Sequence, residues 1–337
     1  MGGLQAQEPA SPYVALWTRL RDFDPAALDR AIRKRRATKA TLMRATLHLV
    51  TTDDYLHLLP AVLPMLQGQN ARRRAPVPEI DALTKRAIEF ASEPRSMTEL
   101  RDHLAPHADT EADGFWWLVK IYAPFVHAPG KTAWSYGRRP LLVGAPAWLK
   151  ERAFADEQAG LEHLVRRYLG AFGPASLADM SQWSGLTIAR LRPAAERITD
   201  IEHYTDEGDR ALIDLADAPL PEGEEEAPVR LLPMWDSSLL AYAKRDRMLP
   251  DEYRKVVIAR NGDVLPTFLV DGLVRGLWWI ELEGGEARMV FEPFRPVSKK
   301  VMAQLREEAD RLLEFLAPHE PAAYSRYRRS RARVIPN

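Results

Sequence analysis

Two consecutive stretches of this chain carry the same succession of segments, and this repetition limits the fold more than any other feature. After a proline-rich break, one helix is predicted over 80–92 and another after Ser96, whose spacing to Glu99 forms a capping box. A third apolar run, at 116–123, precedes two short strands around a turn, at 125–127, 130–132 and 133–136. Three helices and a hairpin form a winged helix, which we predict for residues 75–150.

Residues 151–220 repeat this plan. The pattern predicts a helix ended by Gly-Pro, a second helix capped by Ser176, a third helix and a terminal hairpin, at 158–172, 177–183, from Thr187 and at 203–215. A generic helical bundle is the alternative, but the hairpin that closes each stretch counts against it. We therefore predict a second winged helix here.

The N-terminal residues 1–74 predict a further, incomplete winged helix. Helices are expected over 13–20 and 25–34, the second with Asp24 as N-cap and proline at its first position. The β-branched and apolar run 41–50 predicts a strand.

Beyond residue 220 the hydrophobic period becomes that of strands. Strands are predicted at 229–232, 254–260, 264–270 and 273–281, followed by a helix over 298–315. Residues 221–337 are therefore predicted to form a small antiparallel β-barrel with a C-terminal helix and a basic tail. The fold class is α+β, with tandem winged-helix modules ahead of the barrel.

Composition narrows the classes of protein further. The chain has no cysteine, no long apolar run and no basic, apolar export signal at its start, which predicts a cytoplasmic protein without a disulfide, a Cys-ligated zinc or an iron–sulfur cluster. The histidines show no metal-ligand spacing, namely His57, His103, His107 and His163. We expect no metal, no cofactor, no membrane contact and a monomer.

Charge is balanced overall, with 47 basic and 47 acidic residues, but its distribution is uneven. An acidic loop carries Glu222, Glu224, Glu225 and Glu226, and a basic tail carries Arg326, Arg328, Arg329, Arg331 and Arg333. A basic run lies at Arg33, Lys34, Arg35 and Arg36, with Arg44 beyond it. Such runs are often solvated faces; the functional alternative is contact with the phosphates of double-stranded DNA.

The candidate active site is a Gln-x-Gln motif, Gln5 and Gln7. In an extended segment residues i and i+2 point the same way, so the two amides would converge. Amides donate and accept hydrogen bonds but do not take a proton at neutral pH. Such a pair can hold a water molecule or a polar ligand without acting as a strong base.

Several motifs in the same order along the chain resemble the winged-helix DNA glycosylases of the AlkZ and YcaQ type. They are Gly-Leu-Gln-Ala-Gln-Glu-Pro-Ala-Ser-Pro-Tyr (3–13), Arg-Ala-Thr-Leu-His-Leu-Val (44–50), Tyr-Leu-Gly-Ala-Phe-Gly-Pro-Ala-Ser (168–176), Trp-Ser-Gly-Leu (183–186), Leu-Leu-Pro-Met-Trp-Asp (231–236) and Pro-Thr-Phe-Leu-Val-Asp-Gly (266–272). The resemblance implies three tandem winged helices and a β-barrel around a DNA-sized cleft.

The resemblance also assigns a role to the glutamines. The family's catalytic motif is Gln-x-Gln or Gln-x-Asp, and here it falls on Gln5 and Gln7, as in the AlkZ branch. Family members carry further opening helices before this motif, whereas Met1 stands four residues away. Either the gene start was assigned too late, which we favour, or the support beneath the site has been lost.

The chemistry of two amides matches a modest task. An N7- or N3-alkylated purine is already cationic and leaves as a neutral base, so the enzyme must only hold water and place carbonyl dipoles near the developing positive charge. We predict a monofunctional DNA glycosylase for such bases, with a substrate range that could extend to bulky adducts or interstrand crosslinks. A non-catalytic winged-helix DNA-binding regulator is the alternative, and a protein-interaction scaffold is a third reading.

One histidine is a further candidate for the site. His48 falls in the middle of the predicted strand, with Thr46 and Val50 on the same face by the strand's period of two. A packed core histidine is the ordinary interpretation of such a position. The functional one places His48 at the site, where it would contact phosphate or assist Gln5 and Gln7.

Overall fold

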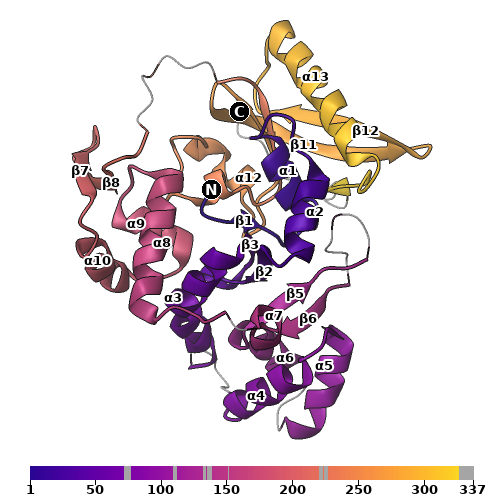
Figure 1. The fold of residues 1–337 in the computed structure, drawn as a ribbon. Helices are drawn as coiled ribbons and strands as arrows, with labels where there is room; N and C mark the ends of the chain where they lie inside the picture. The colour runs from indigo at the N-terminus through magenta and orange to yellow at the C-terminus, as the bar shows by residue number, and fades with distance from the viewer. Residues whose placement is uncertain are drawn as a thin grey trace. The chain divides into compact units, whose positions relative to one another are not determined.

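The computed structural model describes residues 1–71, 77–108, 112–131, 134, 139–150, 152–219, 223 and 227–325. Its backbone divides into two compact units (Figure 1). One consists of Met1–Pro9 and Asp24–Ala218, and the other of Ala10–Phe23 and Pro219–Asn337. Helices combine with antiparallel sheets in both units, as the predicted α+β class requires.

A six-stranded sheet organises the first unit, in the order β1-β3-β2-β5-β6-β4. The strands are β1 (Leu4–Gln5), β2 (Ala37–Thr41), β3 (Leu47–Thr51), β4 (Arg95–Ser96), β5 (Phe125–Ala128) and β6 (Leu141–Gly144). All the pairings are antiparallel, and β2 meets β5 at Ala40 and Val126. The first two predicted modules thus contribute to one sheet, and their division at residue 74 stays a prediction.

The N-terminal part of this sheet differs from the single strand predicted over 41–50. Strand β2 ends at Thr41, a 3₁₀ turn η1 (Met43–Ala45) follows, and β3 begins at Leu47. Helix α2 (Pro25–Arg33) precedes the sheet, and the Asp24 carboxylate accepts the Ala26 N–H as expected of an N-cap.

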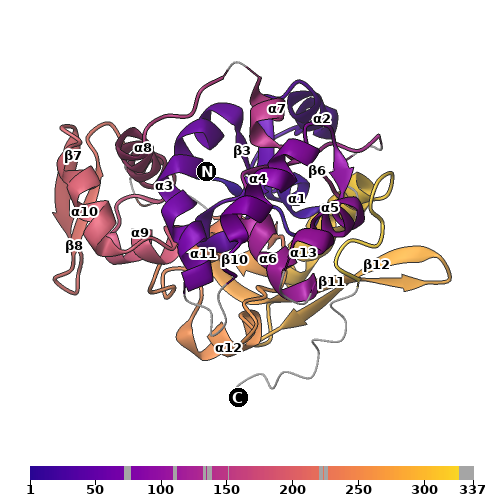
Figure 2. The ribbon, with the colours of Figure 1, turned by 90° about the horizontal axis from the view of Figure 1, so that it is seen from below.

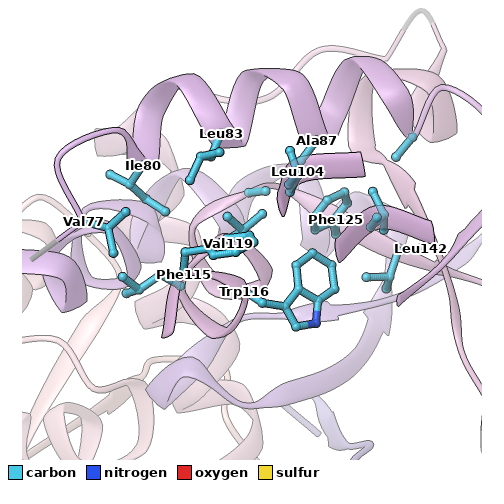
Figure 3. Close-up of a cluster of buried hydrophobic side chains, with 14 residues drawn as sticks. Val77, Ile80, Leu83, Ala87, Leu104, Phe115, Trp116, Val119, Phe125 and Leu142 are labelled. Atoms are coloured by element: carbon cyan, nitrogen blue, oxygen red, sulfur yellow. The ribbon is translucent and has the colours of Figure 1, made fainter. Parts of the chain in front are cut away.

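The second stretch contains helices α4 (Ile80–Phe90), α5 (Met97–Leu104) and α6 (Ala112–Tyr122), with short α7 (Ala145–Leu149) after β6. The Ser96–Glu99 capping box is present at the start of α5. Apolar side chains of α4 and α6, namely Ile80, Leu83, Phe115 and Val119, form one core cluster with Phe125 of β5 and Leu142 of β6 (Figure 3). The observed partner of β5 is β6, not the predicted strand at 133–136, most of which lies outside the described residues.

The third stretch contains α8 (Glu157–Phe172), α9 (Leu177–Ser184), α10 (Ile188–Glu196) and the hairpin β7 (Ile201–Thr205) with β8 (Ala211–Leu215). Ser176 caps α9 with a capping box completed by Asp179. The hairpin lies beside α10 in both views (Figures 1 and 2). The succession of three helices and a hairpin is therefore observed; its assignment to tandem winged helices stays a prediction.

A long helix that the sequence pattern did not indicate, α3 (Thr52–Ala71), packs along α8 (Figure 2). It contains Pro60 and Pro64, which disfavour a helix interior. Its buried side chains, Tyr55, Leu58 and Leu66, outweigh that cost. Gly160 permits close contact, because an added Cβ would meet the backbone of α3.

The predicted barrel is wrong for the described residues of the second unit. Strands β9 (Arg230–Leu232), β10 (Thr267–Val270), β11 (Leu273–Glu283) and β12 (Glu286–Pro293) form an open sheet, in the order β12-β11-β10-β9. The segment predicted as a strand at 254–260 instead begins as helix α12 (Arg254–Val257), after the turn η3 (Asp251–Tyr253). The side chains of Tyr253 in η3 and of Val256 and Val257 in α12 pack in the core of this unit. Among the described residues this segment therefore does not close the sheet into a barrel.

Three other helices belong to this second unit: α1 (Ser11–Trp17), α11 (Ser237–Leu240) and α13 (Lys299–Leu316). The predicted C-terminal helix is confirmed as α13, capped by Ser298, and it contacts both β9 and β12. The acidic loop at 222–226, apart from Gly223, and the basic tail from 326 lie outside the described residues. None of the helices in the described part of the chain has the length and apolarity needed to cross a membrane.

Candidate active site

Gln5 lies at the edge of the six-stranded sheet, in β1. Leu4 pairs with Leu49 and Gln5 pairs with His48, and the pairing extends to the hydrogen bond from Ala6 N to the Leu47 oxygen, 2.9 Å. Gln5 is only 5% exposed. The strand therefore holds the Gln5 amide in a buried position directly opposite His48, on the same face of the sheet.

The two glycines before the motif allow this strand to lie so close to its neighbours. A Cβ on Gly2 would lie 3.0 Å from the Trp183 ring, and one on Gly3 would lie 3.1 Å from Val50 Cγ1. Gly3 also has a φ of 138°, which residues with a side chain rarely adopt. The backbone conformation therefore favours glycine at Gly3, and a side chain at Gly2 would press on the Trp183 ring.

His48 is buried and neutral. Burial, and then the charge of Arg44, lower the pKa of the imidazole to about 3, although its hydrogen bond to the Thr46 oxygen acts in the opposite direction. That bond joins His48 Nδ1 to a carbonyl at 3.0 Å, and a carbonyl only accepts, so Nδ1 carries the proton. Nε2 is therefore a hydrogen-bond acceptor, and it is buried without a partner among the described residues.

Gln7 lies just beyond the strand. Strand β1 ends at Gln5, and Gln7 occupies a bend where the side chain is half-buried. Its Oε1 is buried and has no hydrogen-bond partner among the described residues. The bend means that strand alternation alone does not align Gln7 with Gln5, so the convergence of the two amides stays a prediction.

Arg44 lies in the turn η1, which precedes the strand that carries His48. Arg44 and Ala45 have φ values of 54° and 58°, and the Arg44 guanidinium donates to the Trp183 oxygen. Gly185, the left-handed C-cap of α9, passes so close that a Cβ would lie 3.2 Å from Arg44 Cα. Arg44 thus joins the turn before β3 to the end of α9, and its contact with DNA stays a prediction.

The basic run at 33–36 is not brought to the glutamines. Ala37, which follows it, pairs with Thr51, three residues along β3 from His48 and therefore about 10 Å away. Arg33 donates to the Gly130 oxygen and Arg35 to the Trp148 oxygen. The side chains of Lys34 and Arg36 are exposed. Arg33 is exposed as well but donates to the Gly130 carbonyl, and contact of the run with DNA phosphates stays a prediction.

Two residues at the site were not singled out as site residues from the sequence. The Thr46 hydroxyl donates to Gln5 Oε1 at 3.3 Å, and the Thr46 carbonyl oxygen accepts from His48 Nδ1. The Trp183 carbonyl oxygen accepts from the Arg44 guanidinium, and the Trp183 ring lies next to Gly2. Thr46 could have been found from its place two residues before His48, on the same strand face. Trp183 begins the Trp-Ser-Gly-Leu motif, but nothing in the sequence places that motif beside the glutamines, because the two are far apart in the chain.

His57, His103 and His163 have structural partners. His163 Nε2 lies 2.8 Å from the Asp54 carboxylate and its ring stacks on His57, while His103 stacks on Phe90. Among the described residues no group of three metal-ligating side chains occurs.

Comparison with known proteins identifies the family of the chain. The family described as DNA glycosylase AlkZ-like matches residues 1–315. An interstrand DNA cross-link repair glycosylase from Streptomyces sahachiroi is 24% identical over 339 residues, which cover 91% of this chain and 86% of that protein. The solved structure of Streptomyces sahachiroi DNA glycosylase AlkZ has the same fold, with a TM-score of 0.74 and 20% identity over 92% of this chain and 87% of that one.

The family match includes strand β1 with Gln5, the Gln7 that follows it, the sheet to which β1 belongs and residues of both compact units. It extends over nearly the whole chain rather than over one module. This chain therefore belongs to the AlkZ-like family of DNA glycosylases.

Proposed function

We propose that this protein hydrolyses the N-glycosidic bond of cationic N7- or N3-alkylated purines in double-stranded DNA and leaves an abasic site. The observation that carries the proposal is that Gln5 lies in a buried position opposite a histidine whose pKa is about 3. Neither side chain of this pair removes a proton from water at neutral pH. Such a pair suits a substrate whose base leaves without being protonated.

In this reaction the water oxygen forms a bond to C1′ of the sugar as the bond from C1′ to the purine nitrogen breaks. The electron pair of that bond leaves with the purine and cancels its positive charge, and the proton of the water passes to solvent. The sugar becomes oxocarbenium-like at the transition state. Gln5 and Gln7 contribute carbonyl dipoles to that developing charge, and Gln7 Oε1 and His48 Nε2 are acceptors available to a water.

The sheet also supports a monofunctional enzyme, which uses water rather than an amine. Lys39 is the nearest lysine in the register, opposite Leu49, and burial lowers its pKa to about 8. Because neighbouring residues of a strand point to opposite faces, Lys39 lies on the face opposite Gln5 and His48. An imine between Lys39 and the sugar would require the other face of the sheet.

We also propose that the tandem modules are winged helices that hold the duplex, and that the substrate range includes bulky adducts and interstrand crosslinks. The succession of helices and hairpins in the second and third stretches supports the first point. The name of the Streptomyces sahachiroi relative, an interstrand cross-link repair glycosylase, supports the second.

The test is base release from a duplex oligonucleotide that carries one N7-methylguanine. Gln5→Ala and Gln7→Ala should each lower the single-turnover rate by about 10²-fold, the cost of one removed electrostatic partner, with little change in duplex binding. Strand breakage should require alkaline treatment after the reaction, as expected for an abasic product. The same assay on a crosslinked duplex examines the wider substrate range.

The matched control is Gln304→Ala, which truncates an exposed glutamine of α13 and should keep the wild-type rate. Wild-type turnover in the Gln5→Ala/Gln7→Ala double variant would overturn the catalytic assignment. Salt-sensitive duplex binding without base release at any enzyme concentration would indicate a DNA-binding regulator.

A further inference from the structure

Thr46 lies between the two polar side chains of the site and contacts both. It directly precedes β3, two residues before His48, and is half-buried. Its hydroxyl reaches Gln5 Oε1 at 3.3 Å, and its carbonyl oxygen accepts from His48 Nδ1 at 3.0 Å. One residue therefore connects the amide on β1 with the imidazole on β3.

The hydroxyl proton of Thr46 is available to Gln5. Thr46 Oγ1 also lies 3.0 Å from the Met43 oxygen, so one proton has two acceptors. However, the Met43 oxygen already accepts the backbone N–H of Thr46, at 3.1 Å. The Met43 carbonyl thus keeps a partner when the hydroxyl turns to Gln5.

The contact restricts the freedom of an otherwise mobile group. The terminal torsion of a glutamine is broad, so burial of the side chain alone does not set the direction of its carbonyl. A carbonyl oxygen has two lone pairs. When Thr46 occupies one of them, the direction of the second lone pair of Gln5 Oε1 is defined.

Thr46 is itself held rigidly by the turn that precedes it. Arg44 and Ala45 both adopt left-handed conformations that side-chain-bearing residues rarely adopt, and the Thr46 oxygen also accepts from Leu42 N at 3.0 Å. The Arg44 guanidinium attaches the turn to the Trp183 oxygen. Backbone strain of this kind persists only where the surroundings impose it, which is common at functional sites.

We propose that Thr46 is a positioning residue: its hydroxyl orients the Gln5 amide so that the free lone pair of Oε1 faces the water or the sugar. The proposal rests on the proposed function of Gln5. Thr46 does not touch the reacting atoms. Its effect therefore passes through Gln5 and falls on the rate of the chemical step rather than on the affinity for DNA.

The experiment compares Thr46→Val, which keeps the β-branched shape without the hydroxyl, with Thr46→Ser, which keeps the hydroxyl. In single-turnover release of N7-methylguanine, Thr46→Val should be about 10-fold slower than wild type, the value of one neutral hydrogen bond. Thr46→Ser should stay within about twofold of wild type, and duplex affinity should not change in either variant. Thermal unfolding verifies the folded state, and Thr46→Ala replaces Thr46→Val if the latter does not fold.

A double-mutant cycle with Gln5→Ala separates this proposal from the proposed function. If the hydroxyl acts through Gln5, Thr46→Val should add no loss in the Gln5→Ala background. A wild-type rate in Thr46→Val, an equal defect in Thr46→Ser, or an additive loss in the double variant would each overturn the positioning role. Full activity of Gln5→Ala would instead overturn the proposed function on which this role rests.

Discussion

His48 shows how the surroundings of one side chain decide its chemistry. It is 1% exposed in the middle of β3, and Arg44 is the nearest charge that acts on it. Both effects favour the neutral imidazole, and its carbonyl contact assigns the proton to Nδ1. A histidine in this position accepts a hydrogen bond at Nε2 but does not act as an acid or a base near neutral pH.

The low pKa of His48 predicts a defined loss of stability in acid. The folded pKa, about 3, lies below the ordinary value of 6.5, so the unfolded chain binds the proton more readily. The stability due to neutral His48 is therefore complete above pH 6.5 and falls as the pH is lowered toward 3, by about 1.4 kcal/mol per pH unit. Urea unfolding between pH 7 and pH 4 measures this slope.

His48→Gln removes the titrating group and should flatten the decline by about that amount, even though other groups still contribute. His203→Gln, at an exposed position of β7, is the control and should keep the wild-type slope. Equal slopes for wild type and His48→Gln would contradict the neutral, buried state of His48.

At the scale of elements, the pairing of α3 with α8 supports β1, the strand that carries Gln5. The Asp54 carboxylate of α3 lies 2.8 Å from His163 Nε2 and 3.0 Å from Arg167 Nε, both on α8. Arg167 also donates to the Met1 oxygen, at 3.2 Å, just before β1. The helix pair therefore fixes the residue at the start of the segment that leads into β1, which pairs with β3.

The close approach of these helices depends on one of two glycines in α8. A Cβ on Gly160 would lie 2.5 Å from the His57 oxygen, whereas one on Gly170 would meet only Leu215 Cδ1, at 3.8 Å. Gly160→Ala should therefore lower the free energy of unfolding by about 1–3 kcal/mol. Gly170→Ala should raise it by about 0.5–1 kcal/mol, because alanine favours the helix. Denaturant unfolding of both variants measures these changes. Similar changes in the free energy of unfolding for the two variants would refute the close packing at Gly160.

At the scale of the molecule, the basic side chains differ in how freely they can contact DNA. Within the basic run, the Arg35 guanidinium stacks 4.7 Å over the Trp148 ring and donates to its carbonyl, whereas Lys34 and Arg36 are exposed. Phosphate contacts release counterions, so they make affinity fall with salt. Charges already committed within the fold contribute less to that effect.

Lys34→Ala and Arg36→Ala should each reduce the slope of log affinity against log salt by about 0.9 if the side chain contacts a phosphate. Arg35→Ala, in the same run, should leave that slope unchanged and instead lower thermal stability, because it removes a stacked ring contact. Fluorescence anisotropy with an undamaged duplex over a range of salt measures the slope. A slope that changes only in Arg35→Ala would reverse the assignment.

Signals that act within a few residues predicted much of this fold. The caps at Asp24, Ser96 and Ser176 identified helices whose starts the structure confirms, because a cap binds an amide of its own first turn. The Gln-x-Gln motif and His48 were also visible in the chain as separate local patterns, although their pairing was not. For these features the residue order is sufficient, since the interacting groups are close in sequence or share a strand period.

Features that depend on distant partners were not predictable in this way. The segment 254–257 has strand-like residues yet forms helix α12, because its apolar side chains pack in a core with side chains of β9, β10 and β11. The prolines of α3 argue against a helix that burial nonetheless stabilises. The contact of Thr46 with Gln5 exists only because β1 and β3 pair, and that pairing joins residues about forty positions apart. Such contacts cannot be predicted from the local sequence pattern, because their free energy comes from groups that the local sequence does not contain.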